Sequence, residues 1–339
     1  MAAPRPREAH HFGPDVRHVG GMASVLRVLA EGSVGAQRVV LHPTWVPDDR
    51  RRTLGQLLRA LGAVCRLPAD AVVHVHLAEG GSFVREGAVL AAAHARSLRT
   101  AATLHGADFV AFAAAHPRLV AGVLGRADVV TALSTEARDL AATLAPRARA
   151  VLLPNPVVER TDLRRADEAP EHVLFAGEVS LRKGADVLAA AWPLVTAARP
   201  GATCTLVGPP TDLVVDDAPG LRVLPAVGPA ELRALLDEAR VVALPSRAEA
   251  MPMTLLEAMG AGRPFVATPV GGVPALADDG GTLVPVGDAP ALAEALLAFL
   301  RDPLAARTVG ESGRRACAAS RGLAVVDAEL ARLYAPDAA

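Results

Sequence analysis

Short runs of apolar residues, many of them β-branched, alternate with longer stretches of helical periodicity from about Arg38 onward. Such runs are typical of buried strands in a parallel sheet. The first half of the chain contains five of them, at residues 38–42, 71–77, 100–106, 127–133 and 148–155. Helices are expected between them, including one at residues 49–62 and one that follows the N-cap Ser134. This succession predicts a Rossmann-like domain.

The second half repeats the pattern after a break. Residues 154–173 are rich in proline and charge and lack periodicity, which is typical of a linker. Six further apolar runs follow, at residues 172–177, 202–208, 221–225, 240–246, 264–270 and 281–286, with helices expected at 229–239, 253–261 and 288–300. We therefore predict domains at residues 1–155 and 156–320, and a C-terminal helix within 321–339 that packs back on the first domain.

The predicted fold class is α/β, with two Rossmann-like domains that face each other across a cleft. Ligands of such folds bind beyond the carboxyl ends of the strands, so we expect the chemistry there. One feature does not fit, because no apolar strand precedes the glycine turn at Gly20 and Gly21. Either the first strand is degenerate, or the start of the chain is misassigned.

Composition narrows the class of protein. With 339 residues, of which 51% are hydrophobic, the chain can fill two cores. No run approaches the roughly 18 apolar residues that a membrane span needs, and the N-terminus has no apolar region typical of a secretory signal. Three separated cysteines, Cys65, Cys204 and Cys317, indicate neither a disulfide framework nor a zinc site. A soluble, cytoplasmic protein is expected.

The net charge of −1 hides an asymmetry. Residues 1–155 contain 18 Arg and 12 Asp or Glu, a balance of +6, which leaves −7 for the remainder. The first half is therefore expected to meet an anionic partner. Because aromatic residues are scarce there, we favour a phospholipid surface or a phosphate-bearing acceptor over nucleic acid. The 35 cationic residues include a single lysine, Lys183.

The densest chemical signal is the stretch from Pro245 to Met259, which follows a strand and opens a helix. Free N–H groups at such a helix start can hold a pyrophosphate. Glu249 in the loop and Glu257 one turn into the helix could each bind a vicinal diol through charge-assisted hydrogen bonds. The alternative is that both carboxylates are ordinary solvated groups.

This stretch resembles the signature of a large family of retaining GT-B glycosyltransferases, the family 4-like, group 1 enzymes, which carry two glutamates with seven residues between them. The resemblance extends over residues 172–303 and more loosely over 19–155. It implies that Glu249 contacts the donor sugar and that Glu257 binds the ribose. It also implies that the turn between them contacts the sugar and phosphates through Met251, Pro252, Met253, Thr254 and Leu255.

The strand-loop at residues 175–184 also resembles the family's phosphate-binding loop. Lys183 offers a compact charge that can enter between phosphate oxygens, and with Arg182 it is expected to neutralise the departing diphosphate. The alternative is a chance surface lysine. Two positions depart from the family pattern: Glu178 stands where an arginine is common, and Ala275 where a glutamate is frequent.

Histidines gather near the carboxyl edge of the first predicted sheet. His74 and His76 project from one face of a strand, and His105 ends the next strand. We expect His74 to pack in the core and His105 to face the cleft, where the family resemblance implies contact with the donor sugar. The alternative, a metal site of these three residues, lacks a fourth ligand at suitable spacing. Gly20 and Gly21 match the family's first glycine turn beside the phosphates or acceptor.

The segment at residues 48–62 predicts a helix with leucines on one side and arginines towards the other. Leu54, Leu57, Leu58 and Leu61 form the first group; Arg50, Arg51 and Arg59 form the second. Either this helix docks on an anionic membrane surface, or it covers the sheet and presents a basic face to solvent.

We expect a retaining, metal-independent glycosyltransferase without a cofactor. It would move a sugar from a nucleoside-diphosphate donor to a glycan, a lipid-linked molecule or a small molecule held by the N-terminal domain, with peripheral membrane contact through that domain. Residues 74–87 resemble polysaccharide-assembly members of the family. The alternatives are a nucleotide-sugar epimerase on the same scaffold and a degenerate, non-catalytic sugar-nucleotide-binding subunit. A nicotinamide-dependent oxidoreductase is disfavoured, because no G-x-G-x-x-G motif follows a strand.

Overall fold

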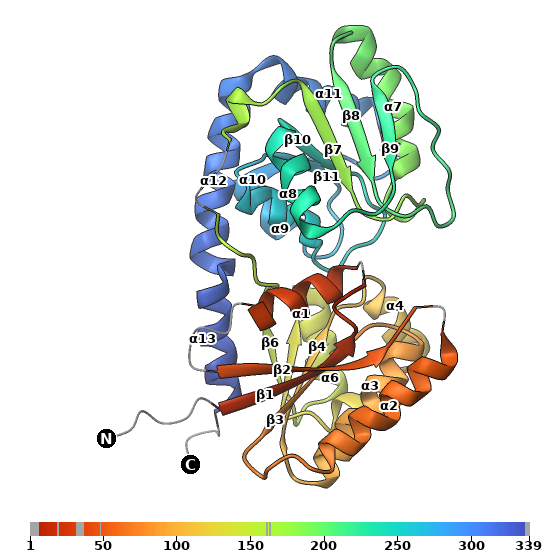
Figure 1. The fold of residues 1–339 in the computed structure, drawn as a ribbon, viewed down its shortest axis with the longest axis vertical. Coiled ribbons are helices and arrows are strands. Elements are labelled where there is room, and N and C mark those ends of the chain that lie inside the picture. The colour runs from red at the N-terminus through yellow and green to blue at the C-terminus, as the bar shows by residue number, and fades with distance from the viewer. Residues whose placement is uncertain are drawn as a thin grey trace. The chain divides into compact units, whose positions relative to one another are not determined.

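A computed structural model describes residues 7–18, 20–31, 37–47, 49–160, 162 and 164–335. The chain divides into two compact units (Figure 1). Unit 1 comprises Met1–Pro156 and Arg321–Ala339, and unit 2 comprises Val157–Ser320. No described helix is both long enough and apolar enough to cross a membrane.

Unit 1 is built on a six-stranded parallel sheet in the order β2-β1-β3-β4-β5-β6. Its strands are β1 (Arg7–Pro14), β2 (Gln37–Trp45), β3 (Val72–Leu77), β4 (Arg99–Leu104), β5 (Val129–Ala132) and β6 (Arg149–Leu152). Every residue of β3 is buried, as expected for a strand covered on both faces. The five predicted strands of this half are therefore confirmed.

The first strand exists, and its sequence is degenerate in the sense that it lacks an apolar run. β1 (Arg7–Pro14) lies between β2 and β3 (Figure 1). Its central residues His10, His11 and Phe12 are buried, at 6%, 1% and 0% exposure. The strand escaped prediction because histidine counts as polar, whereas a neutral imidazole packs well once its nitrogens find partners.

The helices among the described residues of this unit are α1 (Gly21–Glu31), α2 (Arg50–Val64), α3 (Gly81–Ala95), α4 (Phe109–Ala115), α5 (Pro117–Leu124), α6 (Thr135–Leu144) and α13 (Leu323–Tyr334). Two begin at side-chain caps: Asp49 accepts from the Arg52 amide at 2.9 Å, and Ser134 accepts from the Ala137 amide at 3.3 Å. The N-cap predicted at Ser134 is confirmed. From the end of the chain, α13 packs on this sheet, because Arg99 donates to the Leu333 carbonyl at 3.2 Å.

Unit 2 contains a second parallel sheet, in the order β12-β11-β10-β7-β8-β9. Its strands are β7 (His172–Ala176), β8 (Thr203–Val207), β9 (Leu221–Leu224), β10 (Val241–Leu244), β11 (Phe265–Ala267) and β12 (Gly281–Leu283). Its helices are α7 (Ala185–Ala198), α8 (Pro229–Glu238), α9 (Met253–Gly260), α10 (Pro274–Gly280), α11 (Ala289–Arg301) and α12 (Pro303–Arg321). All six predicted strands and the three predicted helices are confirmed.

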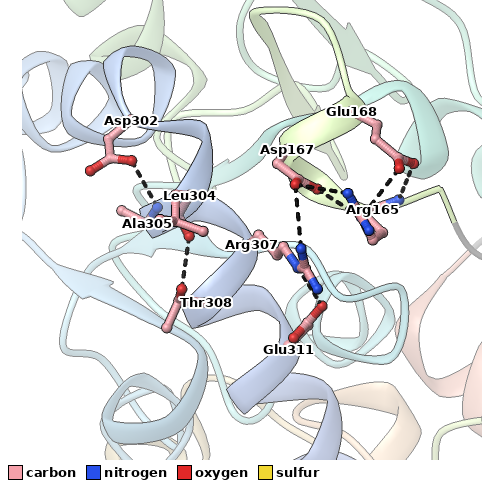
Figure 2. A network of polar contacts seen from close by, with 9 residues as sticks. All are labelled: Arg165, Asp167, Glu168, Asp302, Leu304, Ala305, Arg307, Thr308 and Glu311. Atoms are coloured by element: carbon pink, nitrogen blue, oxygen red, sulfur yellow. Dashed lines mark hydrogen bonds and ion pairs between the residues drawn. The ribbon is translucent and has the colours of Figure 1, made fainter.

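The segment predicted as a linker is anchored to unit 2 by ion pairs (Figure 2). It contains a short 3₁₀ helix, η1 (Ala166–Glu168), whose Asp167 lies 3.7 Å from Arg307 on α12. Arg307 also contacts Glu311 at 2.8 Å, and Arg165 pairs with Asp167 at 3.1 Å. Residues 165–168 are therefore held on this unit despite the lack of periodicity in the segment.

Candidate functional site

The sheet of unit 2 changes winding direction between β7 and β10. The chain runs outward from β7 through β8 to β9, then returns to the other side of β7 and runs outward again from β10 to β12. The loops that leave two such neighbouring strands diverge to opposite faces of the sheet, and the crevice between them is the usual ligand site of a doubly wound fold. The loops concerned are residues 177–184 and 245–252, which carry the residues singled out in the sequence.

An ion pair joins these two loops. Lys183 Nζ lies 2.6 Å from Glu249 Oε1, and the same oxygen accepts from Ser246 Oγ at 2.7 Å. The Lys183 side chain is 16% exposed and the Glu249 side chain 6%. A pair so nearly removed from water is well ordered, because each partner would otherwise leave a desolvated charge. The structure therefore brings together two of the predicted site residues, 66 positions apart.

Two glycines permit the close approach of the loops. Gly184 has a φ of +72°, and a Cβ at this position would lie 2.0 Å from the Pro245 carbonyl oxygen. Gly271, which follows β11, has a φ of +55°, and its Cβ would lie 1.7 Å from the Glu249 carbonyl oxygen. Any side chain at either position would force the backbone apart. The close packing around the ion pair thus depends on glycine at positions 184 and 271.

Arg182 is engaged by the residue that departs from the family pattern. Its guanidinium donates to Glu178 at 2.8 Å in a pair whose side chains are 36% and 47% exposed. Its backbone carbonyl accepts from the Arg247 amide at 2.7 Å, a second tie between the two loops. The charge of Arg182 is therefore partly balanced by Glu178, whereas Lys183 is turned towards Glu249.

The start of α9 places backbone groups beside this pair. Met251, Met253 and Leu255 are buried, at 8%, 6% and 0% exposure, so their apolar side chains pack in the core. Thr254 donates its hydroxyl to the Ala176 carbonyl at 2.7 Å, which fixes the helix against the end of β7. What this turn can offer a ligand is its backbone N–H groups and the positive end of the helix.

Not every N–H of this turn is open to a ligand, since the Leu255 amide donates to the carbonyl of Pro252 at 3.1 Å. Pro252 itself is buried and has no N–H group. Glu257 lies one turn into α9 and is partly exposed.

In unit 1, a chain of hydrogen-bonded imidazoles runs along the sheet. His105 Nε2 contacts His76 Nδ1 at 2.8 Å, and His76 Nε2 contacts His11 Nδ1 at 2.9 Å. His11 Nε2 continues to Tyr334 Oη at 3.3 Å, and Tyr334 Oη to His74 Nδ1 at 2.5 Å. Strand register explains the cluster, because His11 pairs directly with His74 across β1 and β3.

The imidazoles of this chain are uncharged. Burial lowers the pKa of His11 to about 3 and that of His105 to about 3, and it lowers the pKa of His74 and His76 well below the ordinary value. A neutral imidazole has one donor and one acceptor nitrogen. Donors can therefore run in one direction along the whole chain and satisfy every contact.

One group of possible metal ligands lies close together among the described residues: His11, His74 and His76, each with one nitrogen within 4.8 Å of the others. It includes a histidine of β1 in place of the His105 considered from sequence. His11 turns one nitrogen to His76 and the other to Tyr334, so its nitrogens serve different neighbours. The arrangement suits a hydrogen-bonded chain, and a metal ion would have to break it.

His74 packs in the core at 1% exposure, as expected. His105 is partly exposed at the edge of the sheet, with its ring stacked on His76 at a centroid distance of 5.0 Å. Gly20 and Gly21, at the start of α1, are exposed, and a Cβ on either would meet nothing within 4 Å. These glycines border open space on unit 1.

Sequence reasoning missed three participants: Ser246, His11 and Tyr334. Ser246 lies within the motif that drew attention to Glu249, three positions away, and its 0% exposure marks it as structural support for that carboxylate. His10 and His11 were not considered as site residues because the strand that contains them was not predicted. Nothing in the sequence ties Tyr334 to a strand 260 residues away.

Part of unit 2 is similar in sequence to a known protein family. Residues 170–302 match the family described as glycosyl transferases group 1, and this range contains Lys183, Glu249 and Glu257. This match covers less than half of the chain, and it shows which proteins this part of the chain resembles.

The curated relatives overlap with parts of the chain. Glycogen synthase of Mycobacterium tuberculosis is 34% identical over 162 residues, which cover 45% of this chain and 39% of that protein. Phosphatidyl-myo-inositol mannosyltransferase of Propionibacterium freudenreichii is 30% identical over 229 residues, 64% of this chain and 58% of that protein. The chain thus spans about two fifths of the first relative and somewhat more than half of the second.

Solved structures match along nearly the whole chain. HepE from Anabaena, in complex with UDP and glucose, has a TM-score of 0.72 at 16% identity, covering 95% of this chain and 98% of that chain. Sucrose-phosphate synthase from Thermosynechococcus elongatus has a TM-score of 0.76 at 20% identity, covering 97% and 98%. These matches agree with the two-domain α/β fold, GT-B, expected from the sequence.

Proposed function

We propose that this protein transfers a sugar from a nucleoside-diphosphate donor to an acceptor, and that unit 2 holds the donor. The observation that carries the proposal is the Lys183–Glu249 pair at the winding switch of a sheet whose sequence matches the group 1 glycosyl transferases. Structural neighbours are described in complex with UDP or UDP-glucose, which supports a uridine nucleotide as the first donor to try.

Lys183 is suited to the donor diphosphate. Its ammonium group has three N–H donors, of which Glu249 takes one at 2.6 Å. The others remain for phosphate oxygens, while Glu249 keeps the side chain from swinging into solvent. The start of α9 adds a positive dipole and first-turn N–H groups. Leaving-group charge would then be neutralised by groups already in place before the bond breaks.

Glu249 serves two roles in this scheme. Oε1 is engaged by Lys183 and Ser246, so Oε2 is the oxygen left for a sugar hydroxyl. Glu257 is assigned to the ribose diol, in line with the family resemblance. Met251, Pro252, Met253, Thr254 and Leu255 shape the turn between them, with the backbone of the turn facing the phosphates.

Reaction with retention of configuration and without a metal ion completes the proposal. Retention rests on the resemblance to the family. Independence from metal rests on Lys183, Arg182 and the helix terminus, which together supply the positive charge that a divalent ion would otherwise bring.

We assign the acceptor to unit 1, and we propose a glycan or a lipid-linked molecule. The curated relatives support an acceptor of this kind by their names, which include a phosphatidyl-myo-inositol mannosyltransferase and a putative colanic acid biosynthesis glycosyltransferase of Escherichia coli. His105, Gly20 and Gly21 are the residues of unit 1 that we expect beside the reacting groups.

Release of nucleoside diphosphate tests the proposal. Purified protein is incubated with UDP-glucose and a panel of other nucleotide sugars, and both diphosphate release and sugar isomerisation are followed. We expect slow donor hydrolysis that depends on Lys183 and persists in Arg233→Ala, a matched loss of an exposed positive charge on α8. Isomerised donor without release would indicate the epimerase, and donor binding without either product would indicate a non-catalytic subunit.

A further inference from the structure

A concave site lies in unit 1. A cavity of about 770 Å³ is bounded by the segment after β1, the end of β2 and one face of α2. Its lining residues are Asp15, Arg17, His18, Val46, Arg51, Arg52, Gly55, Gln56 and Arg59. Its volume is within the range of about 300–1,000 Å³ typical of small-molecule sites.

The lining is strongly basic. Four arginines face one aspartate, a formal balance of +3 with His18 neutral. Arg17 is held by Asp15, which it contacts through Nε at 3.0 and 3.1 Å, and Arg52 is held by the cap residue Asp49 at 3.2 Å. These two guanidinium groups are therefore oriented by the protein.

The other two arginines are not neutralised. Within the described part of the chain, no carboxylate lies at ion-pair distance from Arg51 or Arg59, which stand eight positions apart on α2. Both side chains are exposed, so their guanidinium groups are available to an anion that enters the cavity.

The shape of the cavity also leaves room for a ligand. Gly55 lines the cavity from α2, and a Cβ at this position would meet no atom within 4 Å, so its missing side chain leaves part of the space open. Glycine is a weak helix former, and an open binding site gives a reason for its place inside this helix. Val46 is the one large apolar side chain in the lining, so the occupant is hydrophilic.

We propose that this cavity binds a phosphate ester carried by the acceptor. A phosphate group presents several oxygens to paired arginine donors, and the balance of +3 matches a phosphate better than a single carboxylate. This deepens the proposed function and rests on it, because the ligand is assigned as the second substrate of the transfer. Arg51 and Arg59 make the specifying contacts, and Asp15 and Asp49 hold the two arginines that complete the ring.

The phosphate ester can come from a soluble sugar phosphate or from a lipid headgroup. Leu54 and Leu58 lie on the same helix as Arg51 and are 58% and 61% exposed. Leu57 and Leu61 instead pack against the core, which corrects the expectation that all four leucines share one face. Exposed leucines beside a phosphate site would enter the headgroup region if the acceptor is lipid-linked.

The experiment measures binding of inorganic phosphate and glucose 6-phosphate by calorimetry to the full chain. Arg51→Gln combined with Arg59→Gln should raise Kd at least about tenfold. Arg50→Gln serves as the matched control, because Arg50 is a neighbouring exposed arginine of α2 outside the cavity lining, and it should change Kd less than about threefold. Equal affinities in all three proteins would overturn the proposal.

Gly55→Leu supplies a second variant that keeps every charge. It fills the open space and favours the helix, so the melting temperature should not fall while phosphate binding is lost. Retained phosphate affinity in a folded Gly55→Leu protein would also overturn the proposal.

Vesicles of phosphatidylcholine with and without phosphatidylglycerol distinguish the two sources. Sedimentation with the anionic vesicles that is lost in Gly55→Leu assigns the phosphate to a lipid. Phosphate binding that depends on the cavity without such sedimentation assigns it to a soluble acceptor. Donor hydrolysis is measured in parallel: if it is absent while the cavity binds phosphate, the proposed function fails and the phosphate site stands.

Discussion

The buried histidine chain makes the stability of unit 1 dependent on pH. Burial lowers the pKa of His11 from the ordinary 6.5 to about 3. A base whose pKa is lowered by folding binds fewer protons in the native state than in the unfolded state, so protonation favours unfolding. The contribution of His11 to stability is therefore fully present above about pH 6.5 and is lost as the pH falls towards 3.

The size of the effect follows from linkage. Between those pKa values, one histidine changes the free energy of unfolding by about 1.4 kcal/mol per pH unit, or about 2.7 kcal/mol at pH 4.5. Burial shifts the pKa of His74 and His76 in the same direction. His74 and His76 therefore add to the loss of stability in acid that His11 causes.

Urea unfolding from pH 4.5 to 7.5, followed by circular dichroism, tests this reasoning. His11→Gln should reduce the slope of unfolding free energy against pH by about one proton. His116→Gln, a change at an exposed histidine of the same unit, is the matched control and should leave the slope unaltered. Identical slopes for the His11→Gln variant and the unaltered protein would refute the account of a neutral buried chain.

Three further predictions concern the proposed reaction. Glu257→Ala should weaken donor binding about 10- to 150-fold, equivalent to roughly 1.5–3 kcal/mol, and unchanged affinity in calorimetry would remove Glu257 from the ribose site. His105→Ala should lower turnover more than it lowers melting temperature, whereas a large melting shift with preserved specific activity would make His105 a core residue. A chelator should leave turnover nearly intact, and a loss reversed by added Zn²⁺ would instead assign a metal to His11, His74 and His76.

Every strand of the unit 2 sheet was predicted from the sequence, whereas β1 of the unit 1 sheet was missed, and the difference has a physical reason. Strands such as Val72–Leu77 and Val241–Leu244 are buried on both faces, so continuous apolar runs marked them. β1 is equally buried but carries His10 and His11, whose partners lie on other strands and on α13. Whether a histidine is solvated or packed is decided by those partners, which a single stretch of sequence does not contain.

The candidate site was predicted by residue type and not by contact. Motif spacing identified Lys183 and Glu249 separately, but their ion pair follows from the winding switch that brings two loops together across 66 positions. The partner of Arg182 was likewise unpredictable, because Glu178 departs from the family pattern and only the loop geometry turns its carboxylate to the guanidinium. The arginine cavity was not predicted either, because it forms only where α2 packs beside the ends of β1 and β2.

The turnover of two variants, Lys183→Ala and Lys183→Arg, tests most directly the central claim that Lys183 binds the donor diphosphate. Lys183 is 16% exposed and lies 2.6 Å from Glu249, so we expect a broad, planar guanidinium in its place to displace neighbouring groups. With the nucleotide-sugar donor at saturation, Lys183→Ala should lower kcat at least about 100-fold, or roughly 2.7 kcal/mol of barrier, and Lys183→Arg should be clearly impaired. Full activity of Lys183→Arg would contradict the geometry, and full activity of Lys183→Ala would contradict the assignment of the donor site.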